Sequence, residues 1–221
     1  MQEVMIERAC ALLADGTVSR VLGWKNGEFA YDPTPAVFDS AEALQKAFVY
    51  NDFCASNLSK YLIKLSRAEG KTLIFVKPCD SYSLNQLLTE HRVKRESIYV
   101  IGVPCDGKVS ENKIRENGVE GVTSITTEGE TVTVHTLYGD TAFQKTDIMD
   151  DRCITCKSKK IVISDEILGE NGEVDADSKR FDQVAQLEAM TPDERYAFWQ
   201  KELSRCIRCN ACRNVCPACS C

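Results

Sequence analysis

The densest feature of the chain is a run of six cysteines within its last sixteen residues. The first three follow one another at intervals of two residues, and the fourth comes three residues later, directly before Pro217. This spacing is typical of a loop that wraps a 4Fe–4S cluster, because one tight turn of chain can present three sulfurs to the corners of a cube. We therefore predict a 4Fe–4S cluster in this segment. Its candidate ligands are Cys206, Cys209, Cys212, Cys216, Cys219 and Cys221.

Zinc is the alternative metal for these cysteines. Structural zinc prefers two separated cysteine pairs, or cysteine with histidine, around one tetrahedral ion. Both histidines, His91 and His135, lie far from the run, which favours the cluster. Cys216, Cys219 and Cys221 compete for the fourth position of the set. A chain that stops on Cys221 suggests either that further residues follow it or that a partner docks there.

Length and composition indicate a globular protein of the cell interior. The 221 residues can bury one substantial core with a small appendage. The net charge of −6 argues against nucleic acid as a partner, and no apolar run approaches the length of a membrane span. The N-terminus lacks the apolar stretch of a secretory signal. Twelve cysteines without export then indicate a reducing, cytoplasmic compartment, in which cysteine clusters serve as metal or redox sites.

A βαβ unit in the first half of the chain sets the fold class. Residues 71–76 and 97–103 are short apolar runs, typical of strands buried on both faces, and a helical pattern over about 81–91 separates them. Strands joined by such a crossover are parallel. We therefore predict an α/β fold with a partly parallel sheet, flanking helices and a β-hairpin, plus a small C-terminal ferredoxin-like cysteine segment.

Periodicity and turn residues locate the other elements. We expect helices over 2–14, 41–48, 55–68 and 192–205, a hairpin over 18–30 that turns at Asn26-Gly27, and a second hairpin over 122–137 that turns at Glu128-Gly129. The composition becomes polar from about residue 139, and residues 164–180 have the composition of a linker. We predict three parts: an α/β core over 1–150, a Cys-x2-Cys element with a linker over 151–190, and a helix with the cluster-binding segment over 191–221.

A second group of cysteines is predicted at one edge of the sheet. Cys79 and Cys105 each follow a buried strand in the same Pro-Cys-Asp frame. Neighbouring parallel strands lie about 4.8 Å apart, and open α/β sheets bind ligands at the carboxyl ends of their strands. Cys153 and Cys156 could supply two more sulfurs. We predict that these four cysteines hold a second 4Fe–4S cluster.

Other interpretations of these cysteines stay open. Cys79 and Cys105 can be small buried residues at strand ends, because free cysteine is often buried. Cys153 and Cys156 can form a redox-active dithiol, although no strand-to-helix context precedes them. Cys10 and Cys54 are expected in the core.

With these residues in place, the chain resembles the beta subunits of deazaflavin-reducing hydrogenases and formate dehydrogenases, in the branch with a C-terminal 4Fe–4S segment. The resemblance covers most of the length. It depends on five stretches: Asn57-Leu58-x-Lys60-Tyr61-Leu62, Val76-Lys77-Pro78-Cys79-Asp80, Ile101-Gly102-Val103-Pro104-Cys105, Arg152-Cys153-x2-Cys156, and Phe198-Trp199-x5-Ser204-Arg205-Cys206.

The resemblance implies cofactors and partners. Members of the family carry FAD with 4Fe–4S clusters, so residues 1–150 would include a flavin domain, with Asn57 and Lys77 as cofactor-binding residues. The segment from Asn51 to Leu58 falls where the family contacts the flavin, but it lacks the paired glycines of many members. The partners would be other redox subunits, such as formate dehydrogenase or heterodisulfide-reductase-like proteins. No G-x-G-x-x-G supports a nicotinamide site.

The sequence as a whole predicts an iron–sulfur, FAD-linked electron-transfer subunit of a multi-subunit cytoplasmic oxidoreductase. It would pass electrons between a two-electron carrier and the clusters of its partners. No catalytic residue is identified, because the chain offers no evident general base or nucleophile. The first alternative is a self-contained oxidoreductase that acts on a deazaflavin coenzyme. The second is a zinc-stapled scaffold without enzymatic activity.

Overall fold

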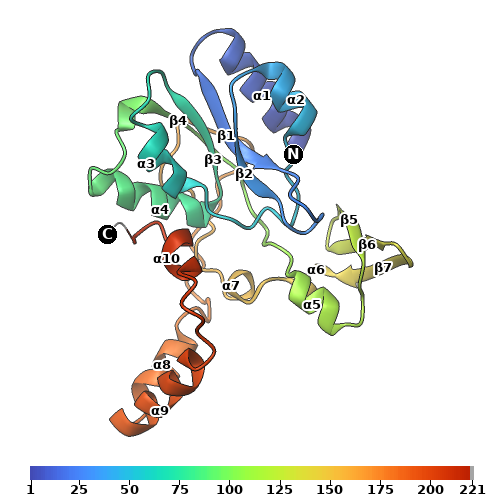
Figure 1. The fold of residues 1–221 in the computed structure, drawn as a ribbon, viewed down its shortest axis with the longest axis vertical. Helices are drawn as coiled ribbons and strands as arrows, with labels where there is room; N and C mark the ends of the chain where they lie inside the picture. Colours follow the sequence, from blue (N-terminus) through green and yellow to red (C-terminus); the bar gives the residue numbers. More distant parts are fainter. Residues whose placement is uncertain (220–221) are drawn as a thin grey trace.

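Two β-sheets organise the chain in the computed structural model, which describes residues 1–219 (Figure 1). The larger sheet has five strands in the order β2-β1-β3-β4-β8. Strand β2 runs antiparallel to β1, whereas β1, β3, β4 and β8 run parallel to one another. The strands are β1 (Arg20–Lys25), β2 (Thr34–Phe38), β3 (Thr72–Val76), β4 (Ile98–Gly102) and β8 (Glu166–Ile167).

The two central strands end level with each other. Val76 of β3 pairs with Gly102 of β4, and the Val103 amide donates to the Val76 carbonyl at 2.8 Å. All five residues of β3 are buried, as expected for a strand that helices cover on both faces. The Pro-Cys-Asp sequences that follow the two strands therefore emerge side by side.

Helices cover both faces of the larger sheet. Figure 1 shows α1 (Gln2–Ala14) and α2 (Ala41–Ala47) on one side, and α3 (Leu62–Leu65) and α4 (Pro78–Thr89) on the other. The short 3-10 helices η1 (Ser59–Tyr61) and η2 (Arg95–Ser97) precede α3 and β4. The main core lies between these layers and contains Met5, Trp24, Leu44, Phe75 and Leu84, which are fully buried.

The smaller sheet has its own core. Its antiparallel strands are β5 (Val122–Glu128), β6 (Thr131–Thr136) and β7 (Gly139–Gln144), and α5 (Glu111–Glu116) and α6 (Lys145–Ile148) lie beside them. Val132 and Val134 of β6 pack with Ile114 and Ile148. The predicted hairpin over 122–137 is confirmed. Strand β7 was not predicted, because it is polar and mostly exposed.

The last third of the chain extends from the body and returns to it. After α7 (Asp151–Ile154) and β8, helices α8 (Asp182–Ala189) and α9 (Pro192–Leu203) project outward, and α10 (Ala211–Val215) lies back near α3 and α4 (Figure 1). The Lys60 ammonium donates to the Arg213 carbonyl at 2.7 Å and so ties α10 to η1. No helix within residues 1–219 is long and apolar enough to cross a membrane.

The predicted fold class is confirmed, with a mostly parallel mixed sheet, flanking helices and a cysteine-rich C-terminal segment. The three-part division at residues 150 and 190 stays a prediction. Within the stretch predicted as a linker, β8 pairs with β4 and closes the edge of the larger sheet.

Three element boundaries were predicted incorrectly. The first hairpin does not turn at Asn26-Gly27, because Lys25 pairs with Thr34 and leaves a loop over 26–33. The helix expected over 55–68 is only η1 and α3, since the Asn57 side chain accepts from the Ser59 amide and holds residues 55–58 outside the helix. Helix α4 begins at Pro78 and not at 81, because proline suits the first helical position. Cys79 therefore lies on the first turn of α4.

Candidate functional site

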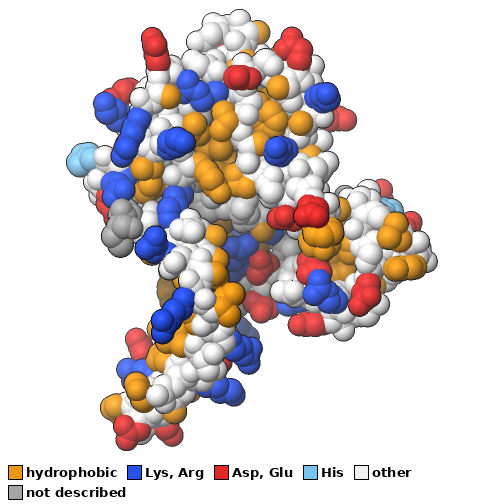
Figure 2. Space-filling model, in the orientation of Figure 1, with side chains coloured by type: hydrophobic (Ala, Val, Ile, Leu, Met, Phe, Trp, Pro, Cys, Tyr) orange, Lys and Arg blue, Asp and Glu red, His pale blue; other side chains and the backbone are white. Residues whose placement is uncertain are grey.

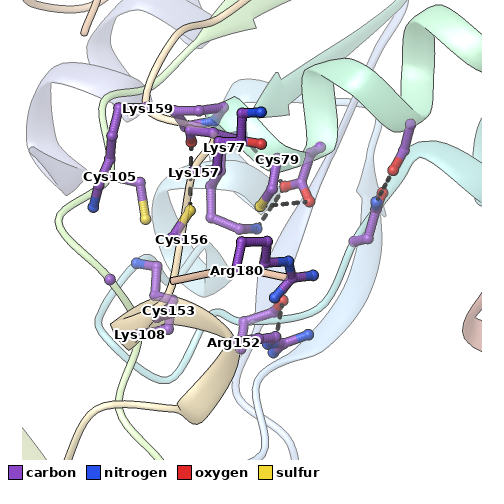
Figure 3. A pocket seen from close by; sticks show the side chains of 17 residues that line it. Lys77, Cys79, Cys105, Lys108, Arg152, Cys153, Cys156, Lys157, Lys159 and Arg180 are labelled. Carbon is purple, nitrogen blue, oxygen red and sulfur yellow. Dashed lines mark hydrogen bonds and ion pairs between the residues drawn. The ribbon is translucent and has the colours of Figure 1, made fainter. Parts of the chain in front are cut away.

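A cavity of about 350 Å³ opens at the carboxyl edge of β3 and β4. Its lining includes all four cysteines that were predicted to gather there, Cys79, Cys105, Cys153 and Cys156. Figure 3 shows the sulfur atoms of Cys79, Cys105 and Cys156 directed toward the same space. We call this cavity the inner cavity. Cys79 and Cys156, which are 77 positions apart in sequence, thus meet around one space.

Each cysteine reaches the inner cavity on a different element. Cys79 lies on the first turn of α4, and Cys105 lies in the loop that follows β4. Cys153 lies on α7, which is held to that loop by a hydrogen bond of 2.8 Å from the Asp150 amide to the Lys108 carbonyl. Cys156 follows α7, and its thiol contacts the Ser158 carbonyl at 3.5 Å.

The inner cavity suits a negatively charged group. Six basic side chains contribute to its lining, whereas Asp80 is the one acidic residue in it among residues 1–219. A 4Fe–4S cluster with four thiolate ligands is anionic, so these cations would offset its charge. The basic residues are Lys77, Lys108, Arg152, Lys157, Lys159 and Arg180.

Two thiols of the inner cavity, those of Cys79 and Cys153, are held in the neutral form by their surroundings. Desolvation, and next the Asp80 carboxylate, raise the pKa of Cys79 to about 12, although the residue still reaches solvent through the cavity. Burial likewise raises the pKa of Cys153. A coordinated metal deprotonates its thiol ligands, so a metal group would supply the positive charge that these thiolates need.

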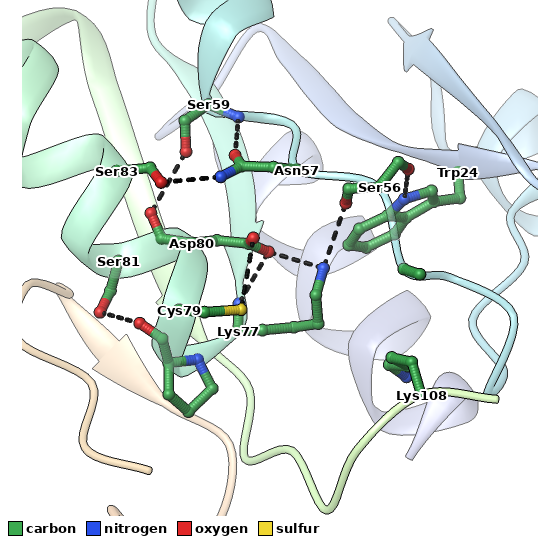
Figure 4. Close-up of polar contacts among 12 residues, drawn as sticks. Trp24, Ser56, Asn57, Ser59, Lys77, Cys79, Asp80, Ser81, Ser83 and Lys108 are labelled. Atoms are coloured by element: carbon green, nitrogen blue, oxygen red, sulfur yellow. Dashed lines mark hydrogen bonds and ion pairs between the residues drawn. The ribbon is translucent and has the colours of Figure 1, made fainter. Parts of the chain in front are cut away.

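A buried ion pair forms one wall of the inner cavity (Figure 4). The Lys77 ammonium lies 2.6 Å from a carboxylate oxygen of Asp80, and both side chains are at most 4% exposed. The ammonium also donates to the Ser56 carbonyl at 3.2 Å and lies 4.8 Å from the ring centroid of Trp24. Burial lowers the pKa of Lys77, but the Asp80 carboxylate outweighs this effect and the net pKa is raised. The lysine is therefore charged.

Asn57 and Lys77, the predicted flavin contacts, both line the inner cavity. Their polar atoms already have protein partners. The Asn57 amide donates to the Ser83 hydroxyl at 2.9 Å, and its oxygen accepts from the Ser59 amide. These bonds fix the loop over 55–58 against α4.

A second cavity, of about 400 Å³, lies beside the first and shares Cys105, Gly107 and Lys108 with it. Asp52 lies in this cavity, 3.0 Å from the Lys145 ammonium and 3.7 Å from that of Lys108. The Lys108 ammonium also lies 4.2 Å from the ring centroid of Tyr50. Burial lowers the pKa of Lys108. We call this space the neighbouring cavity.

The C-terminal cysteines are more exposed than the inner four. Cys206, Cys209 and Cys212 are exposed, whereas Cys216 and Cys219 are partly buried. Backbone amides of Cys219 and Ala218 hydrogen-bond to Cys216 and lower the pKa of its thiol. Cys221 lies outside the described residues.

The loop between Cys206 and Cys212 has an unusual backbone. Arg208 and Asn210 have φ values of 58° and 61°, in the left-handed region that non-glycine residues rarely adopt. Within residues 1–219, no group of three or more His, Cys, Asp or Glu side chains is arranged so that it could hold a metal ion. The structure thus gathers the four inner cysteines around a cavity, but among the described residues it does not gather Cys206, Cys209, Cys212, Cys216 and Cys219 around one of their own.

Sequence reasoning missed several residues of the site. Lys108 lines both cavities, and Arg180 reaches the inner cavity from the predicted linker. Lys108 follows the Pro-Cys-Asp frame by two residues, which is the one signal that could have singled it out. Arg180 lies in a polar stretch with no pattern that indicates a site.

Comparison with known proteins relates the chain to a redox family. No family model matches it. It is 22% identical to "F420-dependent formate dehydrogenase 1 subunit beta" of Methanococcus maripaludis, covering 95% of this chain and 70% of that protein. It is 28% identical to "F420-dependent formate dehydrogenase subunit beta" of Methanocaldococcus jannaschii, covering 45% of this chain but only 26% of that protein.

A solved structure shows the same fold. The match is a chain of the F420-reducing [NiFe] hydrogenase complex from Methanosarcina barkeri, with a TM-score of 0.59 and 13% identity, covering 85% of this chain and 73% of that one. The predicted resemblance is confirmed: the relatives are beta subunits of deazaflavin-dependent formate dehydrogenases, and the fold is shared with a chain of a deazaflavin-reducing hydrogenase complex.

Proposed function

We propose that the chain is an iron–sulfur electron-transfer subunit of a multi-subunit oxidoreductase. The observation that carries this proposal is the convergence of Cys79, Cys105, Cys153 and Cys156 on one cavity at the carboxyl edge of the sheet. The names of the relatives, which are subunits of formate dehydrogenases, support it. In this proposal the four cysteines hold a 4Fe–4S cluster, which supplies one-electron transfer when bound.

The size of the inner cavity favours a cluster over zinc. Four sulfurs around one zinc ion lie about 2.3 Å from it and enclose no free space. Here the four cysteines line a cavity of about 350 Å³. A zinc-stapled scaffold would not need this volume, nor a lining with six cations.

The surrounding residues of the chain would tune such a cluster. Lys108 and Arg152 place positive charge beside the cysteines, and Lys77 keeps its charge through the buried pair with Asp80. Positive charge and hydrogen bonds near the sulfurs favour the reduced, more negative form of a cluster. Cys79 is exposed to solvent, so a partner or a second cofactor can approach the inner cavity.

FAD is the second cofactor that we propose. A flavin supplies the exchange between electron pairs and single electrons when it is bound. Asn57 and Lys77 are its proposed contacts in the inner cavity, and the neighbouring cavity adds room on the far side of Cys105. Lys108 and Lys145 are cations of that cavity which suit a phosphate-bearing ligand.

The C-terminal segment would hold a second 4Fe–4S cluster. Cys206, Cys209 and Cys212 have the spacing of such a loop, and one of Cys216, Cys219 and Cys221 would complete the set. The left-handed residues Arg208 and Asn210 curve the loop between the first and third of these cysteines. The exposure of Cys206, Cys209 and Cys212 suits exchange of electrons with another protein.

Cofactor analysis of anaerobically purified protein tests the proposal. We expect iron, acid-labile sulfide and a broad visible absorption that dithionite bleaches, with released FAD after acid precipitation. Cys105→Ser should remove the iron of one cluster and leave that of the other, whereas Cys10→Ser, the matched control on α1, should leave both. Zinc without iron or sulfide would overturn the proposal, and clusters without FAD would overturn its flavin part alone.

A second candidate is a self-contained oxidoreductase that acts on a deazaflavin coenzyme. It is favoured by the words "F420-dependent" in the names of both relatives. The isolated chain, loaded with FAD and clusters, would then reduce the deazaflavin from an artificial electron donor without a partner subunit. Activity that appears only after a partner is added would support the electron-transfer subunit instead.

A further inference from the structure

A basic groove runs between α3 and the C-terminal segment. It has a volume of about 400 Å³ and is lined by eight residues, of which five are cations and none is acidic. The cations are Lys60, Lys64, Arg67, Arg92 and Arg213. Figure 2 shows Lys and Arg side chains gathered on the face near α3, α4 and α10, with few acidic side chains among them. In a chain of net charge −6, this concentration of positive charge is local and not a general property.

The cysteine segment itself forms one wall of the groove. Arg213 and Asn214 of α10 and the following Cys219 line it opposite Lys64 and Arg67. The bond from the Lys60 ammonium to the Arg213 carbonyl holds this wall against η1. Whatever occupies the groove therefore lies beside the proposed C-terminal cluster.

We propose that the basic groove docks an acidic surface of a partner protein that exchanges electrons with the C-terminal cysteine segment. This inference rests on the proposed function, and it adds the partner's chemistry and its docking place. Complementary charge steers a partner into register and speeds association. An acidic surface seated here would bring its redox group close to Cys219 and α10.

The form of the groove favours a macromolecule over a small anion. Lys64, Arg67 and Arg213 are exposed, and none of the lining residues is buried. A site for a small anion needs donors that are fixed and largely desolvated, whereas long exposed cations suit the polar rim of a protein interface. Because these side chains are exposed, they can contact a surface wider than a single phosphate.

A binding experiment with a charge-reversed pair tests this inference. The probe is a small acidic two-cluster ferredoxin, titrated anaerobically against the cluster-loaded chain at about 50 and about 300 mM NaCl, a range over which screening changes strongly. Lys64→Glu with Arg67→Glu should weaken binding by about tenfold or more at low salt, since like charges at an interface repel. At high salt the same double substitution should weaken ferredoxin binding by a smaller factor.

The matched control reverses two exposed lysines elsewhere. Lys25 at the end of β1 and Lys46 on α2 are exposed and lie outside the groove. Lys25→Glu with Lys46→Glu changes the net charge by the same amount and should alter binding by less than about twofold, because interactions between distant exposed charges are screened. Equal weakening by both pairs would show an effect of net charge alone and would overturn the inference.

Other outcomes also decide against docking. Absence of ferredoxin binding by cluster-loaded wild type would overturn the inference, as would saturable binding of inorganic phosphate without ferredoxin binding. Loss of iron in Lys64→Glu with Arg67→Glu would show that the groove only stabilises the cluster. Iron and sulfide are measured on the same samples. Wild type without clusters would overturn the proposed function. Its binding to ferredoxin is measured independently, so the two proposals can fail separately.

Discussion

Lys77 is a buried charge that the fold can hold only with a partner. Its ammonium and the Asp80 carboxylate lie 2.6 Å apart at the start of α4, with Ser56 and Trp24 completing the environment. Lys77 also stands at the helix N-cap, where the Asp80 side chain accepts from its backbone amide at 3.3 Å. The pair thus fixes the turn that carries Cys79.

Removal of Asp80 should destabilise the protein strongly. In Asp80→Ala the Lys77 ammonium would remain buried without its counter-charge, and such a change lowers the free energy of unfolding by about 3–5 kcal/mol. Urea denaturation of the metal-free protein measures this. Glu111→Ala, which breaks an exposed pair with Arg115, should lower the free energy of unfolding by less than about 1 kcal/mol. Similar losses in the two variants would contradict the importance of the buried pair.

At the scale of elements, α9 is the helix that the sequence predicted best. Thr191, Pro192 and Glu194 form its start, and the structure shows the reciprocal bonds of a capping box. Hydrogen bonds from the backbone and side chain of Thr191 lower the pKa of Glu194 below its ordinary value of 4.5. No side chain of α9 is fully buried, so this helix depends on its cap more than the packed helices do.

Acidification should therefore loosen the start of α9. A lowered carboxyl pKa stabilises the folded form above the ordinary value, and this stabilisation is lost as the pH falls through the folded-state pKa. Hydrogen exchange of the α9 amides, corrected for intrinsic rates, should show less protection below pH 4.5 in wild type, but no such step in Glu194→Gln. Thr191→Ala should reduce protection by about fivefold at neutral pH. A step of equal size in Glu194→Gln would assign it to another group.

The elements that the sequence did not predict share a physical cause. The first hairpin was placed correctly on β1, but its turn depends on the pairing of Lys25 with Thr34, a long-range register that no local dipeptide encodes. Strand β8 has two residues and is held by contacts with distant arginines, Arg8 to Glu166 at 2.8 Å and Arg95 to Asp165 at 2.5 Å. The local pattern of apolar residues does not predict such long-range contacts.

The candidate site was predictable where chemistry repeats in the sequence. The Pro-Cys-Asp frame after two buried strands led to Cys79 and Cys105, and the structure places both on one cavity with Cys153 and Cys156. The cation Arg180 could not be predicted, because a lone arginine in a polar stretch has no sequence signature and its place depends on tertiary packing, and Lys108 had only its position two residues after the Pro-Cys-Asp frame to mark it.

At the scale of the whole molecule, the cysteines of the two proposed cluster sites lie on different elements. The inner cysteines surround a cavity at the carboxyl edge of the larger sheet, whereas Cys206, Cys209 and Cys212 follow the projecting helices α8 and α9. Contact between the parts includes the bond from Lys60 to the Arg213 carbonyl. The sites should therefore load and fail independently.

Cys209→Ala tests this independence. Because Cys209 is exposed and distant in sequence from the core, its loss should remove about half of the iron while the thermal unfolding of the α/β core stays unchanged. Iron and sulfide analysis with near-UV circular dichroism measures both. Unchanged iron would exclude Cys209 as a ligand, and a large fall in melting temperature would show that the tail supports the core.

The placement of β8 has a consequence for the order in which the protein matures. Cys153 and Cys156 lie between the loop after β4, to which Asp150 is bonded, and the edge strand β8, which ends at Ile167. During synthesis, Cys79 and Cys105 are made well before β8 can pair with β4 and before Asp150 can bond to the loop after β4. If the four inner cysteines hold the proposed cluster, it can be inserted only after Cys156 has been made, and a nascent chain stalled before residue 153 would contain Cys79 and Cys105 without the other two thiols.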